Sequence, residues 1–256
     1  MIGSITGDIV GSIFERNSIK TADFPLFIPT SRYTDDTVLT VTVAEAIVKK
    51  IPYGETIKDF AHRYPHAGYG HAFYAWAHSE DSRPYNSRGN GSAMRVSPVG
   101  FAFNTLDEVL QEARRSAEIT HNQAEGIRGA QATALSVFLA RKGENKKAIK
   151  EEIGNRFRYD LNRSLKEIRN SYRFDVSCQG SVPESIIAFL ESVSVEDAKR
   201  KAISLGGDSD TMACIAGGIA KAYFREIPDL IVNEVQKRLP DEFLTIIDSF
   251  HRRYGR

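Results

Sequence analysis

The chain has 256 residues, of which 41% are hydrophobic and 26% are charged, as in an ordinary globular protein. This length is near the upper size of a single hydrophobic core, so we expect one domain over residues 1–256. The formal net charge of +1 lacks the basic excess that most nucleic-acid-binding proteins show.

Helical periodicity dominates the sequence and alternating strand patterns are nearly absent, which predicts an all-α fold. At the start, Ile5, Ile9 and Ile13 fall on one side of a predicted helix, and Asp8 and Glu15 fall on another. Glycines at positions 3, 7 and 11 suit close packing of that helix. Two prolines predict a loop over residues 21–32. Residues 38–50 are apolar on nearly every side, which predicts a buried helix.

The middle of the chain alternates between weak and strong helical patterns. Residues 65–100 are only weakly periodic, and we expect part of this region to be a functional loop. Residues 105–141 predict two helices with a break near 120–122. Residues 145–173 predict a helical segment whose many Arg and Lys are mixed with acids, which indicates a solvated face rather than a polyanion site.

The last third predicts further helices. Pro183 suits the first turn of a helix, Ser194 with Asp197 resembles a capping box, and Gly206 suits a helix end. Residues 212–224 predict a second helix with little polar surface, after that of residues 38–50. Two amphipathic helices, roughly 228–238 and 241–254, complete the chain.

Both buried helices begin with an acidic cluster bracketed by hydroxyl side chains. One is Thr34-Asp35-Asp36-Thr37, and the other is Asp208-Ser209-Asp210-Thr211. Capping explains either cluster alone, because Asp, Ser and Thr are preferred caps and acids suit the positive end of a helix. Together they would bring four carboxylates to one place, where unpaired buried charge is costly. Bound cations would relieve that repulsion.

The candidate ligands are all oxygen atoms, with no His or Cys among them, which favours Mg²⁺, with Mn²⁺ as the substitute. Four aspartates with threonine hydroxyls suit two ions about 3.5–4 Å apart, an arrangement used in hydrolysis. Glu15 is a candidate fifth carboxylate, although taken alone it fits a surface position better.

These motifs resemble the ADP-ribosylglycohydrolase family, which includes dinitrogenase reductase-activating glycohydrolase and the ADP-ribosyl-acceptor hydrolases. The resemblance covers almost the whole chain, and its specific part is the pairing of T-D-D-T with G-G-D-S-D-T. Weaker parts are Gly7–Ser12 with Glu15, Gly89–Arg95, Thr120-His121 and Val182–Ser185. It implies an orthogonal helical bundle with two Mg²⁺ in a central cleft.

The resemblance also implies roles for single residues. Thr34, Asp35, Asp36 and Asp210 would hold one ion, and Asp208, Asp210 and Thr211 the other. Glu15 matches a glutamate that serine-specific members place beside the metals. Catalytic roles would fall to Glu15, Asp35, Asp36 and Asp210. Substrate binding would fall to the loop and one histidine: Gly89, Asn90, Gly91, Ser92, Met94, Arg95 and His121.

The loop and the histidine also have ordinary explanations. Small residues in Gly89–Arg95 let backbone N–H groups reach a diphosphate, but a Gly-Asn-Gly sequence is also typical of a turn. His121 matches a position near the adenine, yet a lone histidine at a helix start is often structural. Asp81 lies too far upstream to match the additional catalytic aspartate of the arginine-specific bacterial enzyme.

The expected activity is hydrolysis of the C1″ bond between ADP-ribose and an acceptor, which reverses ADP-ribosylation. Glu15 or a metal-ligating aspartate is the candidate base, and the acid stays unassigned. The acceptor is an ADP-ribosylated protein or a small conjugate, and the sequence leaves nucleic-acid-linked ADP-ribose open. The alternatives are a metal-dependent nucleotide phosphohydrolase, a non-catalytic ADP-ribose-binding regulator, and a structural protein whose acids are only caps.

The remaining features indicate a cytoplasmic monomer. No uncharged apolar run reaches about 18 residues, so we expect no membrane span. The first 15 residues carry acids and no basic residue before the apolar stretch, unlike a signal peptide. Cys178 and Cys214 form no metal or redox motif and are expected to be reduced thiols.

Overall fold

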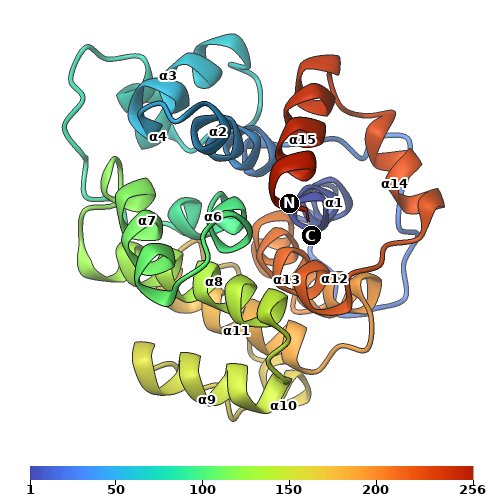
Figure 1. Ribbon diagram of the computed structural model, residues 1–256. Coiled ribbons are helices and arrows are strands. Elements are labelled where there is room, and N and C mark those ends of the chain that lie inside the picture. Colours follow the sequence, from blue (N-terminus) through green and yellow to red (C-terminus); the bar gives the residue numbers. More distant parts are fainter. Residues whose placement is uncertain (256) are drawn as a thin grey trace.

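The computed structural model describes residues 1–255, and every named element among them is a helix (Figure 1). The predicted all-α fold is therefore confirmed. Buried apolar residues form one cluster that runs from the first helix to the last. No helix of the described residues is long and apolar enough to cross a membrane. The helices are α1 (Ile2–Gly11), α2 (Asp35–Lys49), α3 (Tyr53–Arg63), α4 (His71–Ala77), α5 (Gly91–Met94), α6 (Ser97–Ala102), α7 (Leu106–Glu118), α8 (Ala124–Lys142), α9 (Lys146–Phe157), α10 (Leu165–Arg169), α11 (Cys178–Leu190), α12 (Val195–Ile203), α13 (Ser209–Phe224), α14 (Asp229–Gln236) and α15 (Asp241–Tyr254).

Helices α1 and α13 pack backbone against backbone in the middle of the molecule (Figure 1). A Cβ atom on Gly7 would lie 2.0 Å from the carbonyl oxygen of Ala213, and one on Gly3 would lie 2.2 Å from that of Gly217. Gly11 continues the stripe against the first turn of α13. The glycine spacing thus does bring two helices into close contact, as predicted, because only glycine leaves room for it.

The other helices enclose this pair. Helix α13 also contacts α8, α11 and α12, while α2 contacts α1 and α15. Both helices predicted to be buried are buried: Asp36–Ile47 of α2 and Ser209–Ala220 of α13 are covered along their whole length. Because α2 and α13 are held against α1, their N-termini meet beside its C-terminal half.

Two predicted boundaries are wrong. Pro183 lies inside α11 and does not open it, because the Ser177 side chain accepts from Gly180 N (3.0 Å) and caps the helix earlier. The segment 145–173 holds two helices, since Arg158 adopts a left-handed conformation (φ 59°) that ends α9. The break near residue 120 and the Ser194 cap of α12 are confirmed.

Candidate metal centre

Five carboxylates gather where the N-termini of α2 and α13 meet α1. Asp8, Asp36 and Asp210 each offer an oxygen within 4.8 Å of the others, and so do Glu15, Asp208 and Asp210. Asp210 thus belongs to both groups. Thr211 links the two helices by donating to Asp36 Oδ2 (3.1 Å).

Asp8 is the buried anchor of this arrangement. Its carboxylate accepts from the backbone N–H of Thr34 (2.9 Å) and of Thr37 (3.0 Å), and from both threonine hydroxyls. A side chain of α1 therefore satisfies the free N–H groups at the start of α2. Burial raises the pKa of Asp8 to about 6, and these four hydrogen bonds oppose the rise.

Asp36 has the opposite character, because part of its carboxylate is unsatisfied. Its Oδ1 is buried without a hydrogen-bond partner, while Oδ2 accepts from Thr211 Oγ1. Thr34 Oγ1 also lies 3.4 Å from Oδ2, but its one hydrogen is given to the nearer Asp8 carboxylate. Burial, with the negative charges of Asp8 and Asp35, raises its pKa well above the usual range. A buried carboxylate oxygen without a donor is costly, and a cation would satisfy it.

The neighbouring acids show the same repulsion. Burial raises the pKa of Asp208 and, together with the charges of Asp36 and Asp208, raises that of Asp210 well above its usual range. Within residues 1–255, no ion pair involves any carboxylate of the two groups. The positive ends of two helices offset only part of this charge. The donor set fits a hard divalent cation held by oxygen atoms.

Asp35 and Glu15 lie at the edge of the centre. Asp35 is half-buried and outside both groups; burial, followed by the charges of Asp8 and Asp208, raises its pKa to about 8. Glu15 is also half-buried and lies with Asp208 and Asp210. Because α1 ends at Gly11, Glu15 reaches them from the turn that follows, and not from the helix itself.

The loop that precedes α5 is joined to this centre. Asn90 Nδ2 donates to Asp208 Oδ2 (2.7 Å) and to Ser181 Oγ (3.2 Å). Its backbone N–H donates to the Val176 carbonyl (2.7 Å), beside an isolated bridge between Gly89 and Ser177. The loop is thus held between the acidic centre and the segment that leads into α11.

The side chains of the loop turn inward. The Ser92 hydroxyl donates to the Gly126 carbonyl (2.7 Å), and the Met94 carbonyl accepts from Thr40 Oγ1 (3.3 Å). Arg95 is fully buried and donates to the Ser116 carbonyl (2.6 Å). The Ser92 and Arg95 side chains are therefore engaged within the protein, while Asn90 reaches the acidic centre.

His121 lies beneath the loop and is 3% exposed. A Cβ atom on Gly91 would be 3.5 Å from its Cε1, and one on Gly89 would be 3.8 Å from its Nε2. Burial lowers the pKa of His121 to about 3, the charge of Arg95 lowers it further, and a hydrogen bond with the Gly89 backbone opposes both. The imidazole is neutral at any physiological pH.

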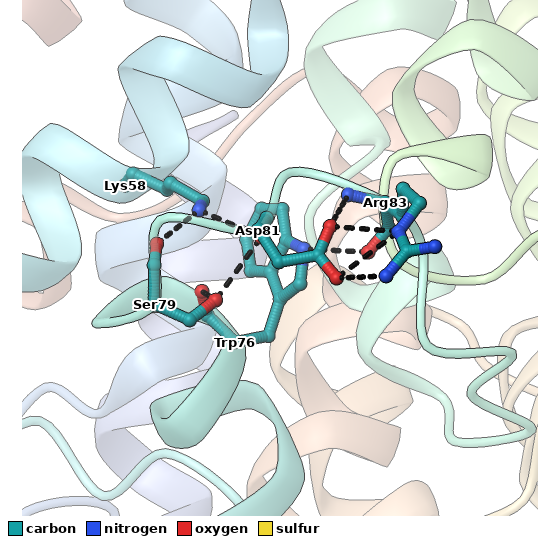
Figure 2. A network of polar contacts seen from close by, with 5 residues as sticks. All are labelled: Lys58, Trp76, Ser79, Asp81 and Arg83. Atoms are coloured by element: carbon teal, nitrogen blue, oxygen red, sulfur yellow. Dashed lines mark hydrogen bonds and ion pairs between the residues drawn. The ribbon is translucent and has the colours of Figure 1, made fainter.

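The loop after α4 holds Asp81 in a network of polar contacts with Lys58, Ser79 and Arg83 (Figure 2). The exposed Asp81 carboxylate pairs with Arg83 (2.8 Å). Lys58 of α3 donates to the carbonyls of Ser79 (2.7 Å) and Asp81 (3.1 Å) and lies 4.9 Å from the centroid of the Trp76 ring. The Asp81 side chain is therefore committed to its own loop.

Sequence reasoning missed Asp8 and Thr37 as parts of the site. Asp8 was counted only in a polar stripe of the first helix, and Thr37 only as a flanking hydroxyl. The available signal was an acid amid apolar residues and glycines, which is unusual for a helix that packs on both sides. The contact with α2 is tertiary and has no pattern in the sequence.

Comparisons with known proteins agree with this geometry. A model of the ADP-ribosylglycohydrolase family matches residues 1–256. ADP-ribosylhydrolase ARH3 of Homo sapiens is 27% identical over 306 residues, covering 88% of this chain and 84% of that protein. ADP-ribosylarginine hydrolase Tri1 of Pseudomonas putida (strain GB-1) is 23% identical, covering 88% of this chain and 69% of that protein.

The fold is shared with a solved structure described as an ADP-ribosylglycohydrolase-related protein complex. The two chains superimpose with a TM-score of 0.73 at 23% identity, covering 99% of this chain and 97% of the other. With the family model matching from end to end, the chain is a hydrolase that belongs to the ADP-ribosylglycohydrolase family.

Proposed function

We propose that this hydrolase cleaves the C1″ glycosidic bond between ADP-ribose and an acceptor, using two Mg²⁺ ions held by the acidic centre. The observation that carries the proposal is the pair of carboxylate groups that share Asp210 and have no basic partner. Asp36 with Asp210 would hold one ion, and Asp208 with Asp210 the other. Asp35 and the hydroxyls of Thr34 and Thr211 complete the ligand set that the family motif implies.

The buried unpartnered Oδ1 of Asp36 supports a resident cation, because such an atom otherwise has nothing to compensate its lost hydration. When bound, Mg²⁺ supplies Lewis-acid polarisation of the ribose hydroxyls and of water. Asp8 has a different role. Its carboxylate accepts four hydrogen bonds, so it holds the start of α2 and keeps Asp36 in position.

Glu15 is the proposed base. It is half-buried, so water reaches it, and it lies with Asp208 and Asp210. Asp81, the acid nearest in sequence to the diphosphate loop, is exposed and paired with Arg83. Since Glu15 matches the glutamate of serine-specific members, we expect serine-linked ADP-ribose to be turned over faster than the arginine-linked form.

The Gly89–Arg95 loop would bind the diphosphate. Its side chains point inward, so backbone N–H groups at the start of α5 are its available donors, and Asn90 connects them to Asp208. The phosphates would then lie close to the acidic centre, because Asn90 directly precedes α5. Such an arrangement suits a ligand that has a diphosphate next to a ribose.

The test is incubation with serine-, arginine- and nucleic-acid-linked ADP-ribose, each with and without Mg²⁺. We expect Mg²⁺-dependent release of intact ADP-ribose. Release of phosphate would indicate a phosphohydrolase instead, and ADP-ribose binding without turnover of any substrate would indicate a regulator. Full turnover after dialysis against excess EDTA would refute the metal assignment.

A further inference from the structure

A chain of buried polar side chains connects α5 with the start of its own loop. Arg95 Nη2 donates to Thr120 Oγ1 (3.0 Å), and Thr120 Oγ1 lies 2.7 Å from Nδ1 of His121. The other ring nitrogen of His121 faces the Gly89 backbone. Arg95 and Thr120 are fully buried, and His121 nearly so.

The direction of these hydrogen bonds follows from the first donor. A guanidinium only donates, so the Thr120 oxygen accepts from Arg95 and its own hydrogen needs an acceptor. Among the hydrogen bonds of residues 1–255, its remaining partner is His121 Nδ1. Nδ1 must therefore be unprotonated, which places the ring hydrogen on Nε2, toward the Gly89 backbone.

The reverse order is unfavourable at both ends. With the hydrogen on Nδ1, the Thr120 hydroxyl would have a buried hydrogen and no acceptor. The bare Nε2 would also lose its polar contact with the Gly89 backbone. A buried polar group that loses its partner destabilises the fold. The environment of His121 thus selects one of two neutral forms of the ring.

The Gly89 peptide beside Nε2 is held from other sides. The Gly89 carbonyl accepts from Cys178 Sγ (3.1 Å), and the next N–H, that of Asn90, donates to Val176. The orientation of this peptide fixes where the following amides of the loop point. His121 therefore acts on the loop by setting its first peptide.

We propose that Arg95, Thr120 and His121 are positioning residues that hold the Gly89–Arg95 loop through this one proton order. They act on the loop backbone, beside which His121 lies. The inference rests on the proposed function for the identity of the ligand, ADP-ribose. The proton order itself requires no ligand and is tested without one.

The first experiment measures the His121 ring directly. Long-range ¹H–¹⁵N NMR of the ¹⁵N-labelled full chain should show Nε2 protonated and Nδ1 unprotonated, with no titration between pH 5.5 and 8.5. In Thr120→Val the Nδ1 signal should move toward that of a free ring nitrogen, while Thr120→Ser should keep the parental signal. A parent ring with its hydrogen on Nδ1 would overturn the proposal, whether or not any variant folds.

The second experiment measures how the hydrogen bonds among Arg95, Thr120 and His121 affect ligand binding by the loop. Thr120→Val should weaken ADP-ribose binding in calorimetry about tenfold, the effect of losing about 1.4 kcal/mol. It should raise KM and leave kcat and Mg²⁺ binding nearly unchanged, and Thr120→Ser should restore affinity. Thr133→Val is the matched control, because the Thr133 hydroxyl is equally buried but has no partner.

The two experiments distinguish a failure of the positioning role from a failure of the proposed ligand. Parental ADP-ribose affinity in a Thr120→Val variant with an altered ring signal would overturn the positioning role. An equal loss of affinity in Thr133→Val would reduce the effect to general packing and overturn it as well. A parent that binds no ADP-ribose would refute the proposed ligand, while the NMR result would still decide the proton order.

Discussion

The sharpest test of the metal centre is Asp210→Asn. Asp210 lies within 4.8 Å of acids in both groups, so it is the one residue through which two ions would share a ligand. The substitution keeps the shape of the side chain and removes one negative charge. Burial and the charges of Asp36 and Asp208 raise the pKa of Asp210 well above its usual range, so a neutral amide removes an unfavourable charge from the metal-free protein. The melting temperature of the metal-free variant should therefore be unchanged or higher.

With Mg²⁺ the two proteins should differ. The carboxylate oxygens of one group lie at most 4.8 Å apart. Two unit charges at that distance interact by about 3.5 kcal/mol at an effective dielectric constant of 20. Mg²⁺ at 100 times its Kd stabilises the parent by about 2.7 kcal/mol, which is a rise of about 5–10 °C for a chain of this size. Losing a shared charge should weaken binding by about a hundredfold or more, which reduces the rise to about 1 °C.

The assay is thermal melting in EDTA and in Mg²⁺, beside measurement of ADP-ribose release. Asp229→Asn is the matched control, since Asp229 is an exposed acid in the first turn of α14 and should retain the parental response. Turnover should be abolished only in Asp210→Asn. Parental turnover with an undiminished Mg²⁺ shift in that variant would refute the bridging role and with it the main argument for two ions.

Three further outcomes follow from the structure. Gly7→Ala should lower the free energy of unfolding, measured in urea, by about 1–3 kcal/mol or more, because the new Cβ would lie 2.0 Å from the Ala213 carbonyl oxygen. A variant as stable as the parent would show that α1 and α13 are further apart. In EDTA the protein should melt at a higher temperature at pH 6 than at pH 8.5. The folded-state pKa is about 8 for Asp35 and about 6 for Asp8, so protonated carboxyls stabilise the fold and this stability is lost as the pH rises through those values. A melting temperature that is constant or rises with pH would contradict this. Gly91→Val should weaken ADP-ribose binding in calorimetry and spare Mg²⁺ binding, and equal affinities would place the diphosphate elsewhere.

Much of the fold was predictable because burial leaves a direct pattern in the sequence. The all-round apolarity of α2 and α13 predicted two buried helices, and the glycines of α1 predicted a close helix contact. Pro183 misled because a proline suits a first turn, while the Ser177 cap had already started α11 five residues earlier. Local signals compete, and tertiary contacts decide between them.

Some residues of the candidate site could likewise be predicted from the sequence, and others could not. The clusters at the starts of α2 and α13 were visible because each is contiguous in sequence. That they meet was an inference from charge. Asp8 could not be found by that route, since its four donors come from residues 26 and 29 positions away. The inward positions of Arg95 and His121 were equally hidden, because motif matching identifies residues and not the direction of side chains.

The glycine contact between α1 and α13 also bears on how the protein is made. Gly7 leaves the ribosome roughly 200 residues before Ala213, an interval of about 10–40 s at usual rates of synthesis. Throughout that time α1 can meet α2 but not α13, so the glycine stripe of α1 stays uncovered. The acidic centre cannot form on a nascent chain until α13 has emerged, because Asp208 and Asp210 lie at the start of that helix. The yield of folded enzyme should therefore depend on how well the first helix is shielded during translation, and slower synthesis should lower it.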